Sequence, residues 1–272
     1  MKYSFLGAIS LLSFSSFGCA AFVGIEDATG DLSESAGAAG TGFAGESGAG
    51  HAGTGAQGGA GMGGAASAGM GGAGAVTAEE LLALVQSCKV VSKGKYKTDD
   101  EDNLPEKIDI CGLNGAVFWQ ADMDIDCDGQ TTAECNLAAD PAYQDETSAT
   151  DSQDKPLVAS VLPYVVIPLP SSRFDYTKAG LTLGSVVAVI YKNQLAFGVF
   201  GDEGPENIIG EASYAMAKSL GIDPDPSTGG TDGPVTYIAF TGRGTVTSPI
   251  EDHEAAVSLG QTLAAQLIKA NP

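Results

Sequence analysis

Residues 185–200 read SVVAVIYKNQLAFGVF, two runs of β-branched and aromatic residues separated by Lys192 and Asn193. Two residues that include an Asn between such runs predict a tight hairpin of strands 185–191 and 194–200. Further strand-like runs lie at 116–119, 164–167 and 235–240, and Gly, Pro and Asp are frequent between them. Short strands joined by such loops favour a small barrel over a parallel α/β sheet. We therefore expect a β-rich α+β domain, a small β-barrel with flanking helices.

Three helices are expected around these strands. Thr77 and Glu80 have the spacing of a capping box, and apolar residues follow at helical spacing until about Cys88. A second helix is expected over 211–220. A third is expected over 248–269, with a Pro at its first position and a capping-box Glu.

The first 76 residues have the composition of an export signal and a tether. A positive start, an apolar run and small residues predict a signal peptide over 1–18. The small residues before Cys19 predict a bacterial lipoprotein site with a lipid on Cys19; the alternative is an ordinary secretory signal with an incidental Cys. Residues 19–76 are rich in Gly and Ala with little apolar bulk, which predicts a disordered tether. We expect a secreted protein or cell-envelope lipoprotein, folded over 77–272, that meets a membrane only through this lipid.

The charge of the chain excludes some classes of function. The sequence holds 13 Lys and Arg against 34 Asp and Glu, for a formal net charge of -21. Phosphate repels such a surface, so a nucleic-acid partner is not expected, whereas a cationic partner suits it. Of the 2 His, His51 lies in the Gly/Ala tract, so a zinc site with several His is excluded. Acid–base chemistry would therefore fall to carboxylates.

Four cysteines remain in the expected folded domain, and an even number in an exported domain predicts two disulfides. Three pairings are open to four cysteines. Closeness in sequence favours Cys88–Cys111 and Cys127–Cys135.

An unusual run of Asp follows the strand at 116–119. Asp122, Asp124, Asp126 and Asp128 are every second residue, so on an extended chain they would share one face. Such close like charges must be separated by water or neutralised by a cation or a basic ligand. Three interpretations remain open: a calcium site, although the closing Glu of a helix–loop–helix site is missing, a rim for a cationic ligand, or a solvated acidic loop.

A second acidic segment, GDEGPENIIGE, spans 201–211. Asp202 would sit at the end of a strand and Glu211 near the start of a helix. Two carboxylates on rigid elements that face one cleft are what glycoside hydrolysis needs, one as acid and one as base or nucleophile. The alternative is a polar turn with Glu211 placed favourably at a helix N-terminus.

Several stretches, taken in order, carry a family resemblance: ADMDIDCDG at 121–129, PYVVIP at 163–168, 184–221, and VTYIAFTG at 235–242. From about residue 111 onward the chain resembles the chitosanases of glycoside hydrolase family 75. The resemblance implies an enzyme that hydrolyses chitosan with inversion and needs no metal or cofactor. By analogy, it also implies a double-psi-like barrel.

The resemblance further assigns roles to residues. It implies that Asp202 and Glu211 are the catalytic pair, and we favour Glu211 as the acid. Glu203 stands where many relatives have a small polar residue, so the local charge departs from the family pattern while the pair is kept. Chitosan carries ammonium groups that a carboxylate-lined cleft would attract. The residues that we expect to bind it are Asp122, Asp124, Asp126 and Glu203.

The expected places of Trp119, Tyr164 and Asp128 and two alternative functions complete the sequence predictions. Trp119 and Tyr164 are expected in the core rather than as sugar platforms, because both lie in apolar runs. Asp128 is expected to point away from the other Asp residues. The alternative functions are a lipoprotein that cleaves peptidoglycan and a non-catalytic surface module that depends on calcium.

Overall fold

The computed structural model describes residues 74–100 and 103–272. The predicted signal peptide, the lipid site at Cys19 and nearly all of the predicted tether lie outside these residues. Among the described helices, none is both long enough and apolar enough to cross a membrane.

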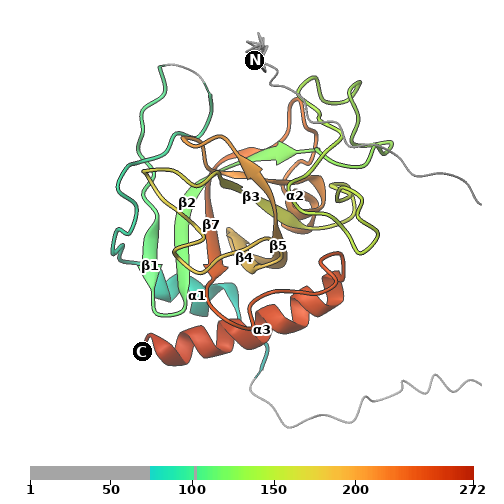
Figure 1. Ribbon diagram of the computed structural model, residues 1–272. Coiled ribbons are helices and arrows are strands. Elements are labelled where there is room, and N and C mark those ends of the chain that lie inside the picture. The colour runs from blue at the N-terminus through green and yellow to red at the C-terminus, as the bar shows by residue number, and fades with distance from the viewer. Residues whose placement is uncertain (1–73, 101–102) are drawn as a thin grey trace, which may run out of the picture. The chain divides into compact units, whose positions relative to one another are not determined.

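Within the described residues, six strands close into a barrel, and the last strand pairs back with the first (Figure 1). A further strand, β1 (Cys111–Leu113), extends the edge of β2. The small barrel with flanking helices that the sequence predicted is therefore confirmed. Around the barrel the order is β2 (Ala116–Asp126), β6 (Glu211–Ser213), β3 (Tyr164–Pro168), β5 (Gln194–Gly204), β4 (Val186–Tyr191) and β7 (Thr231–Phe240).

The barrel mixes two kinds of strand pairing. β4 and β5 form the predicted hairpin, in which Tyr191 pairs with Gln194 across the two-residue turn. By contrast, β3 pairs with β5 in parallel, and β2 pairs with β6 in parallel. Parallel strands need long crossover connections. These pairings therefore bring together segments that lie far apart in the sequence, and they build the site described below.

The barrel interior is filled by large apolar side chains. Trp119 stacks on Tyr237 with ring centroids 5.2 Å apart. Met216 and Ala217, from the short helix α2 (Tyr214–Ser219), join the same core. Trp119 and Tyr164 are both buried, which confirms their expected place in the core.

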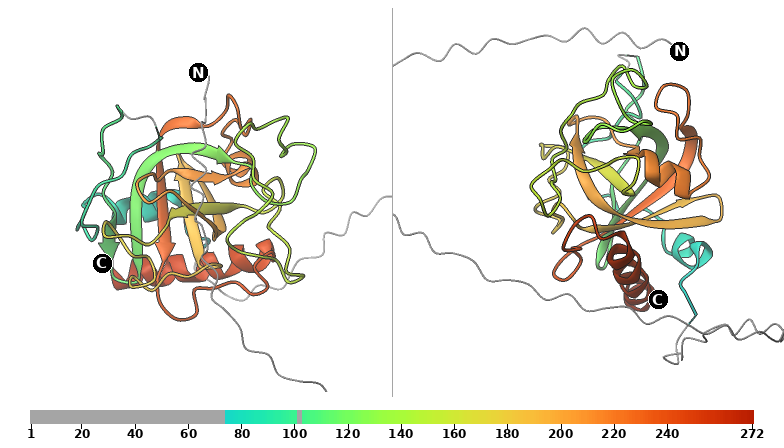
Figure 2. Two further views of the ribbon diagram at one scale, coloured as in Figure 1. Left: turned by 45° about the horizontal axis from the view of Figure 1, so that its top comes forward. Right: turned by 90° about the vertical axis from the view of Figure 1, so that its right-hand side faces the viewer.

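Two helices cover one outer face of the barrel. Side chains of α1 (Ala78–Leu84) and α3 (His253–Ala270) pack with outward-facing residues of β4, β5 and β7 (Figure 2). Gly260 of α3 lies so close to Phe197 that an added Cβ would stand 2.3 Å from the ring. A larger residue at this position would push the helix off the barrel.

The helix boundaries differ from the sequence predictions at three places. α1 has the predicted capping box of Thr77 and Glu80 but ends at Leu84 rather than Cys88. Residues 211–213 form a strand, so the second helix starts later than predicted and Glu211 is not at its N-terminus. The last helix begins at His253, where Asp252 caps it by accepting the Ala255 N–H, instead of at 248.

The strand β2 runs on through most of the Asp run. It bends over one end of the barrel (Figure 2, light green), and its register against β7 shifts between Ala121 and Met123. Such a bulge lets a long strand change its direction and its partner. β2 therefore leaves β7 and pairs with β6 over 124–126.

The two predicted disulfides are confirmed. Cys88 is bonded to Cys111, which ties the segment after α1 to β1. Cys127 is bonded to Cys135, which closes the loop that follows β2.

Candidate active site

Four neighbouring strands present their outer faces at one part of the barrel wall. Ala212 and Val165 pair across β6 and β3 and point into the barrel core. Side chains alternate along a strand, so Glu211, next to Ala212, points outward. Asp202 pairs with Val166, whose side chain belongs to the outer cluster. The outer face of β2, β6, β3 and β5 therefore carries both predicted catalytic carboxylates.

Asp202 and Glu211 stand on either side of β3. The strand order is β6, β3, β5, so Glu211 of β6 and Asp202 of β5 are two strands apart. Neighbouring strands are about 4.8 Å apart, which puts these two backbones roughly 10 Å from each other. Carboxyl groups carried by strands on either side of a third can stand on the two sides of one glycosidic bond.

Glu211 lies in surroundings that favour its protonated form. Burial, followed by the negative charges of Asp124, Asp128 and Asp202, raises the pKa of Glu211 to about 8. No hydrogen-bond donor among the described residues offsets this. Gly204 at the end of β5 leaves space for the carboxyl group, because a Cβ there would stand 3.1 Å from Glu211 Oε2. Glu211 is thus a carboxylic acid that keeps its proton at neutral pH.

Asp202 is also buried, at 7% exposure, but its surroundings stabilise a negative charge better. The Ser148 N–H and the Ser148 hydroxyl donate to Asp202 Oδ1 at 2.8 and 2.6 Å. The Glu203 N–H donates to the same oxygen at 2.7 Å. Burial raises the pKa of Asp202, and the bonds from Ser148 act against that rise. Such an environment suits a base beside an acid.

Two further carboxylates gather beside Asp202. Carboxylate oxygens of Asp126, Asp128 and Asp202 lie within 4.8 Å of one another. Asp128 was expected to point away from the other Asp residues, and this expectation is wrong. Asp128 follows the end of β2, where the chain turns, and Gln144 holds its carboxylate through the Gln144 N–H at 2.7 Å and Nε2 at 3.2 Å.

The three carboxylates also differ in how much charge they can carry. Burial, and then the charges of Asp128, Asp202 and Glu211, raise the pKa of Asp126 well above its usual range. The pKa of Asp128 rises to about 7, mainly through burial, although the Gln144 bonds oppose the rise. Like charges this close do not all ionise together, and burial disfavours the charge on Asp126 although its Oδ1 accepts the Asp128 N–H at 2.7 Å.

This group of three is the one place among the described residues where side chains could hold a metal ion. The donor set suits calcium poorly, because Ca²⁺ takes six to eight oxygens and all three of these carboxylates already accept a backbone N–H group. Asp122, Asp124 and Asp126 lie in a strand, so the Asp run does not form the loop of a helix–loop–helix calcium site.

Other acidic residues extend the site beyond Glu211. Asp124 is exposed and pairs with Glu211 across the parallel strands. Burial and the charge of Asp124 raise the pKa of Asp122 to about 8, and its Oδ1 is buried without a hydrogen bond. The charge of Asp99, from the loop after α1, contributes to the raised pKa of Asp122, Asp124 and Glu211. A continuous acidic row thus leads up to the two carboxylates.

Of the four residues expected to bind substrate, two lie in other settings than predicted. Asp126 was expected at a rim and is buried, at 9% exposure. Glu203 pairs with Ile167 of the inner core, and its carboxylate accepts a hydrogen bond from the Tyr176 hydroxyl at 2.6 Å. Asp122 and Asp124 are the two that lie along the acidic row.

Three residues of the site were missed at the level of sequence: Asp128, Gln144 and Ser148. Asp128 carried a signal, since it belongs to the Asp run. Gln144 and Ser148 carried none, because they lie in a polar loop and reach the site only through the fold.

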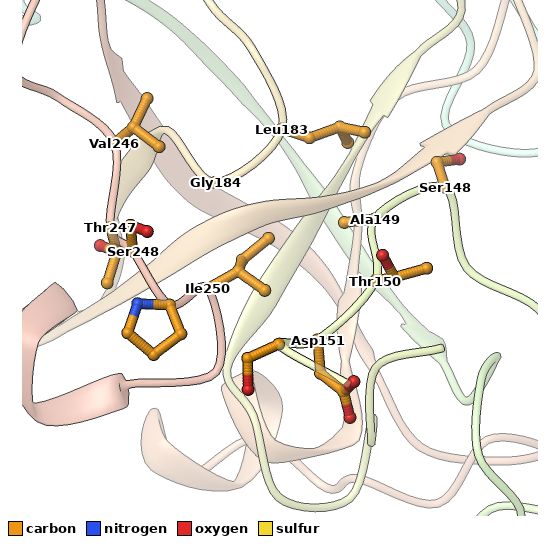
Figure 3. Close-up of a pocket in the computed structure, with 12 residues that line it drawn as sticks. Ser148, Ala149, Thr150, Asp151, Leu183, Gly184, Val246, Thr247, Ser248 and Ile250 are labelled. Atoms are coloured by element: carbon orange, nitrogen blue, oxygen red, sulfur yellow. The ribbon is translucent and has the colours of Figure 1, made fainter. Parts of the chain in front are cut away.

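A pocket of about 440 Å³ begins next to the site. Figure 3 shows Ser148 at one end of the loop 148–152 that forms a wall of this pocket, with Val246 and Thr247 on the opposite side. Ser148 therefore stands between the pocket and Asp202.

Comparison with known proteins is consistent with this geometry. Residues 123–266, which contain both carboxylates, match the family described as "Fungal chitosanase of glycosyl hydrolase group 75". Endo-chitosanase B of Aspergillus oryzae is 31% identical over 204 residues, which cover 66% of this chain and 84% of that protein. An endo-chitosanase of Aspergillus fumigatus is 31% identical over 172 residues, covering 58% and 71%. An endo-chitosanase of the Aspergillus oryzae strain ATCC 42149 / RIB 40 is 36% identical over 153 residues, covering 52% and 62%. The chain therefore belongs to the chitosanases of glycoside hydrolase family 75.

Proposed function

We propose that this protein is an exported endo-chitosanase that hydrolyses β-1,4 bonds between glucosamine units with inversion. One observation carries the proposal: Glu211 and Asp202 lie two strands apart on one outer face, and Asp202 accepts hydrogen bonds that support its ionised form whereas Glu211 has none from the described residues. Inverting glycosidases use such a pair, with carboxyl groups about 6.5–9.5 Å apart so that a water fits beside the sugar.

The roles follow from the protonation states. Glu211 donates its proton to the glycosidic oxygen as the bond to the anomeric carbon breaks. A water attacks that carbon from the opposite face, and Asp202 accepts the proton that the water loses. Glu211 is then ionised and Asp202 protonated, and exchange with solvent restores both.

The acidic row gives the substrate class. Each deacetylated unit of chitosan carries an ammonium group, and Asp122, Asp124 and Asp99 lie beside Glu211 where neighbouring units would bind. Attraction by such a row of carboxylates concentrates a cationic polymer and holds it in place. We propose Asp122 and Asp124 as residues that bind the amino groups. Asp126 and Glu203 would act on the substrate more indirectly, through the charge of the site.

Location and domain organisation are part of this proposal. Two disulfides are compatible with an oxidising, extracellular setting. We propose a signal peptide over 1–18, a tether over 19–76 with a lipid on Cys19, and a catalytic domain over 77–272. The names of the relatives favour chitosan over peptidoglycan or calcium as the ligand.

The test is hydrolysis of soluble, highly deacetylated chitosan, followed by viscosity and by reducing ends. An endo-acting enzyme lowers viscosity long before many reducing ends appear. Proton NMR of the first product then reads the anomer: inversion gives the α-anomer from a β-linkage. Absence of hydrolysis by well-folded protein would overturn the proposed activity. Release of the β-anomer would overturn the proposed inverting mechanism.

A further inference from the structure

One loop residue, Ser148, bonds to the proposed base through both its backbone and its side chain. Ser148 N and Ser148 Oγ donate to Asp202 Oδ1 at 2.8 and 2.6 Å. The same Oγ accepts the Glu203 N–H at 3.1 Å. The hydroxyl has one proton, and the Glu203 N–H fills an acceptor position, so its O–H is directed to Asp202.

These bonds leave the two oxygens of Asp202 in different states. All three donors, the two of Ser148 and the Glu203 N–H, bond to Oδ1. None of the described residues donates to Oδ2, so that oxygen is left for water. A carboxylate held through one oxygen has a fixed orientation, and its other oxygen can take a proton from a positioned water.

The charges around Asp202 make such donors necessary. The ionisable groups that act on it are Asp126 and Asp128 from β2 and the turn after it, Glu211 from β6, Glu203 on its own strand, and Tyr164 from β3. Every one of these is an acid, so none offers Asp202 a positive charge, and the negative charges of Asp128 and Glu203 disfavour a negative charge on it. Hydrogen bonds to the ionised form are what oppose this repulsion.

We propose that Ser148 is a positioning residue for hydrolysis: it holds Asp202 ionised and oriented so that Oδ2 receives the proton of the attacking water. This inference rests on the proposed function. Gln144, four residues earlier in the same loop, holds Asp128 in a similar way through its N–H and Nε2. The loop thus donates hydrogen bonds to two of the three neighbouring Asp residues, Asp128 and Asp202.

The setting of Ser148 makes it suitable for substitution. Ser148 is exposed and borders the open pocket of about 440 Å³ that Figure 3 shows, so its side chain can change without filling a packed core. The chain also offers a matched control. Ser152, in the same loop, donates its hydroxyl to Glu251 and makes no bond to Asp202.

The experiment compares Ser148→Ala, Ser148→Thr and Ser152→Ala with the wild-type full-length protein on chitosan oligomers across pH. Loss of a hydrogen bond to a charged group should lower kcat of Ser148→Ala by roughly ten- to a hundred-fold, with little change in KM. Asp202 must be ionised to act, and removal of a donor raises its pKa. The acidic limb of the pH profile should therefore move up by about one pH unit. Ser148→Thr keeps the hydroxyl and should restore both, and Ser152→Ala should match wild type.

The outcomes separate this inference from the proposed function. If wild type hydrolyses chitosan and Asp202→Asn does not, while Ser148→Ala keeps the wild-type rate and acidic limb, the role of Ser148 is refuted and the function stands. Equal loss at every pH, without recovery in Ser148→Thr, would mean a merely structural role and would also overturn the inference. No hydrolysis by wild type would refute the proposed function itself, and a carboxyl NMR titration of Asp202 would then decide on Ser148. An unchanged pKa in Ser148→Ala would reject the inference.

Discussion

Asp124 of β2 and Glu211 of β6 are register partners across a pair of parallel strands. Residues in register on neighbouring strands point to the same face, so the two carboxyl groups leave the barrel wall side by side. The charge of Asp124 is the largest electrostatic contribution, after burial, to the raised pKa of Glu211. A pairing of backbone strands therefore creates the conditions for a proton donor.

The first prediction concerns the catalytic pair. Glu211→Gln and Asp202→Asn should each lower kcat on chitosan by about 10² to 10⁴-fold, because each removes a proton transfer from the transition state. Glu206→Gln is the matched control, since Glu206 is exposed in the turn between the two and its loss should leave the rate unchanged. Circular dichroism and melting temperature should show that all three variants fold. Near wild-type activity in either catalytic variant would remove that residue from the pair.

The second prediction is a dependence of stability on pH. The pKa of Glu211 and of Asp122 is about 8 in the folded protein, above the usual value near 4 of an unfolded chain. Between these values the folded state binds more protons than the unfolded state, so the free energy of unfolding falls as pH rises. The melting temperature should therefore be higher at pH 5 than at pH 8.

The variant Glu211→Gln tests whether the site causes this dependence of the melting temperature on pH. Glu211→Gln cannot ionise, so it should melt at a higher temperature than wild type at pH 8 and with a weaker dependence on pH. Glu206→Gln should keep the wild-type slope. A wild-type melting temperature that rises from pH 5 to pH 8 would show that other groups dominate.

The fold could be predicted largely from local signals. The hairpin at 185–200 was visible because β-branched runs flank a turn that suits Lys192 and Asn193, and Lys192 indeed takes a φ of 54°. Glu211 was misplaced on a helix because a three-residue strand has no periodicity of its own. What makes 211–213 a strand is its pairing with β2 and β3, which no local pattern encodes.

The site was predictable only in part for the same reason. Asp202 and Glu211 lie in one short segment, so motif and chemistry pointed to both. The grouping of Asp126 and Asp128 with Asp202 depends on contacts between distant parts of the chain. From sequence alone, a run of Asp residues indicates a solvated loop or a rim. The burial of Asp126 depends on the fold and could not be predicted from the sequence.

The third prediction concerns recognition of the cationic polymer. Asp124→Asn removes a charge from the acidic row and should raise KM for chitosan several-fold. It should also move the basic limb of kcat to lower pH, because the charge of Asp124 helps to raise the pKa of Glu211. Salt should raise KM of wild type too, because ions screen exposed charges. Glu254→Gln, an exposed acid in the first turn of α3, is the control for net charge. Equal changes in Glu254→Gln and Asp124→Asn would mean that only overall charge matters.

The fourth prediction separates the two disulfides by function. Removal of Cys88–Cys111, with a sequence separation of 23, should lower the free energy of unfolding by about 3 kcal/mol. Removal of Cys127–Cys135, with a separation of 8, should cost about 2.5 kcal/mol. The expected effects on activity differ more, because Cys127 stands between Asp126 and Asp128 whereas Cys88–Cys111 joins segments away from the acidic group.

Paired Cys→Ala variants of each bond, assayed at a temperature where both are folded, test this difference. The variant without Cys88–Cys111 should keep most of the wild-type rate. The variant without Cys127–Cys135 should lose activity, because the loop after β2 no longer fixes Asp128 beside Asp202, and its acidic limb should shift as the charges rearrange. Equal activity in the two variants, at equal fraction folded, would show that the loop keeps its position without the bond and that the strand β2 alone places the Asp residues.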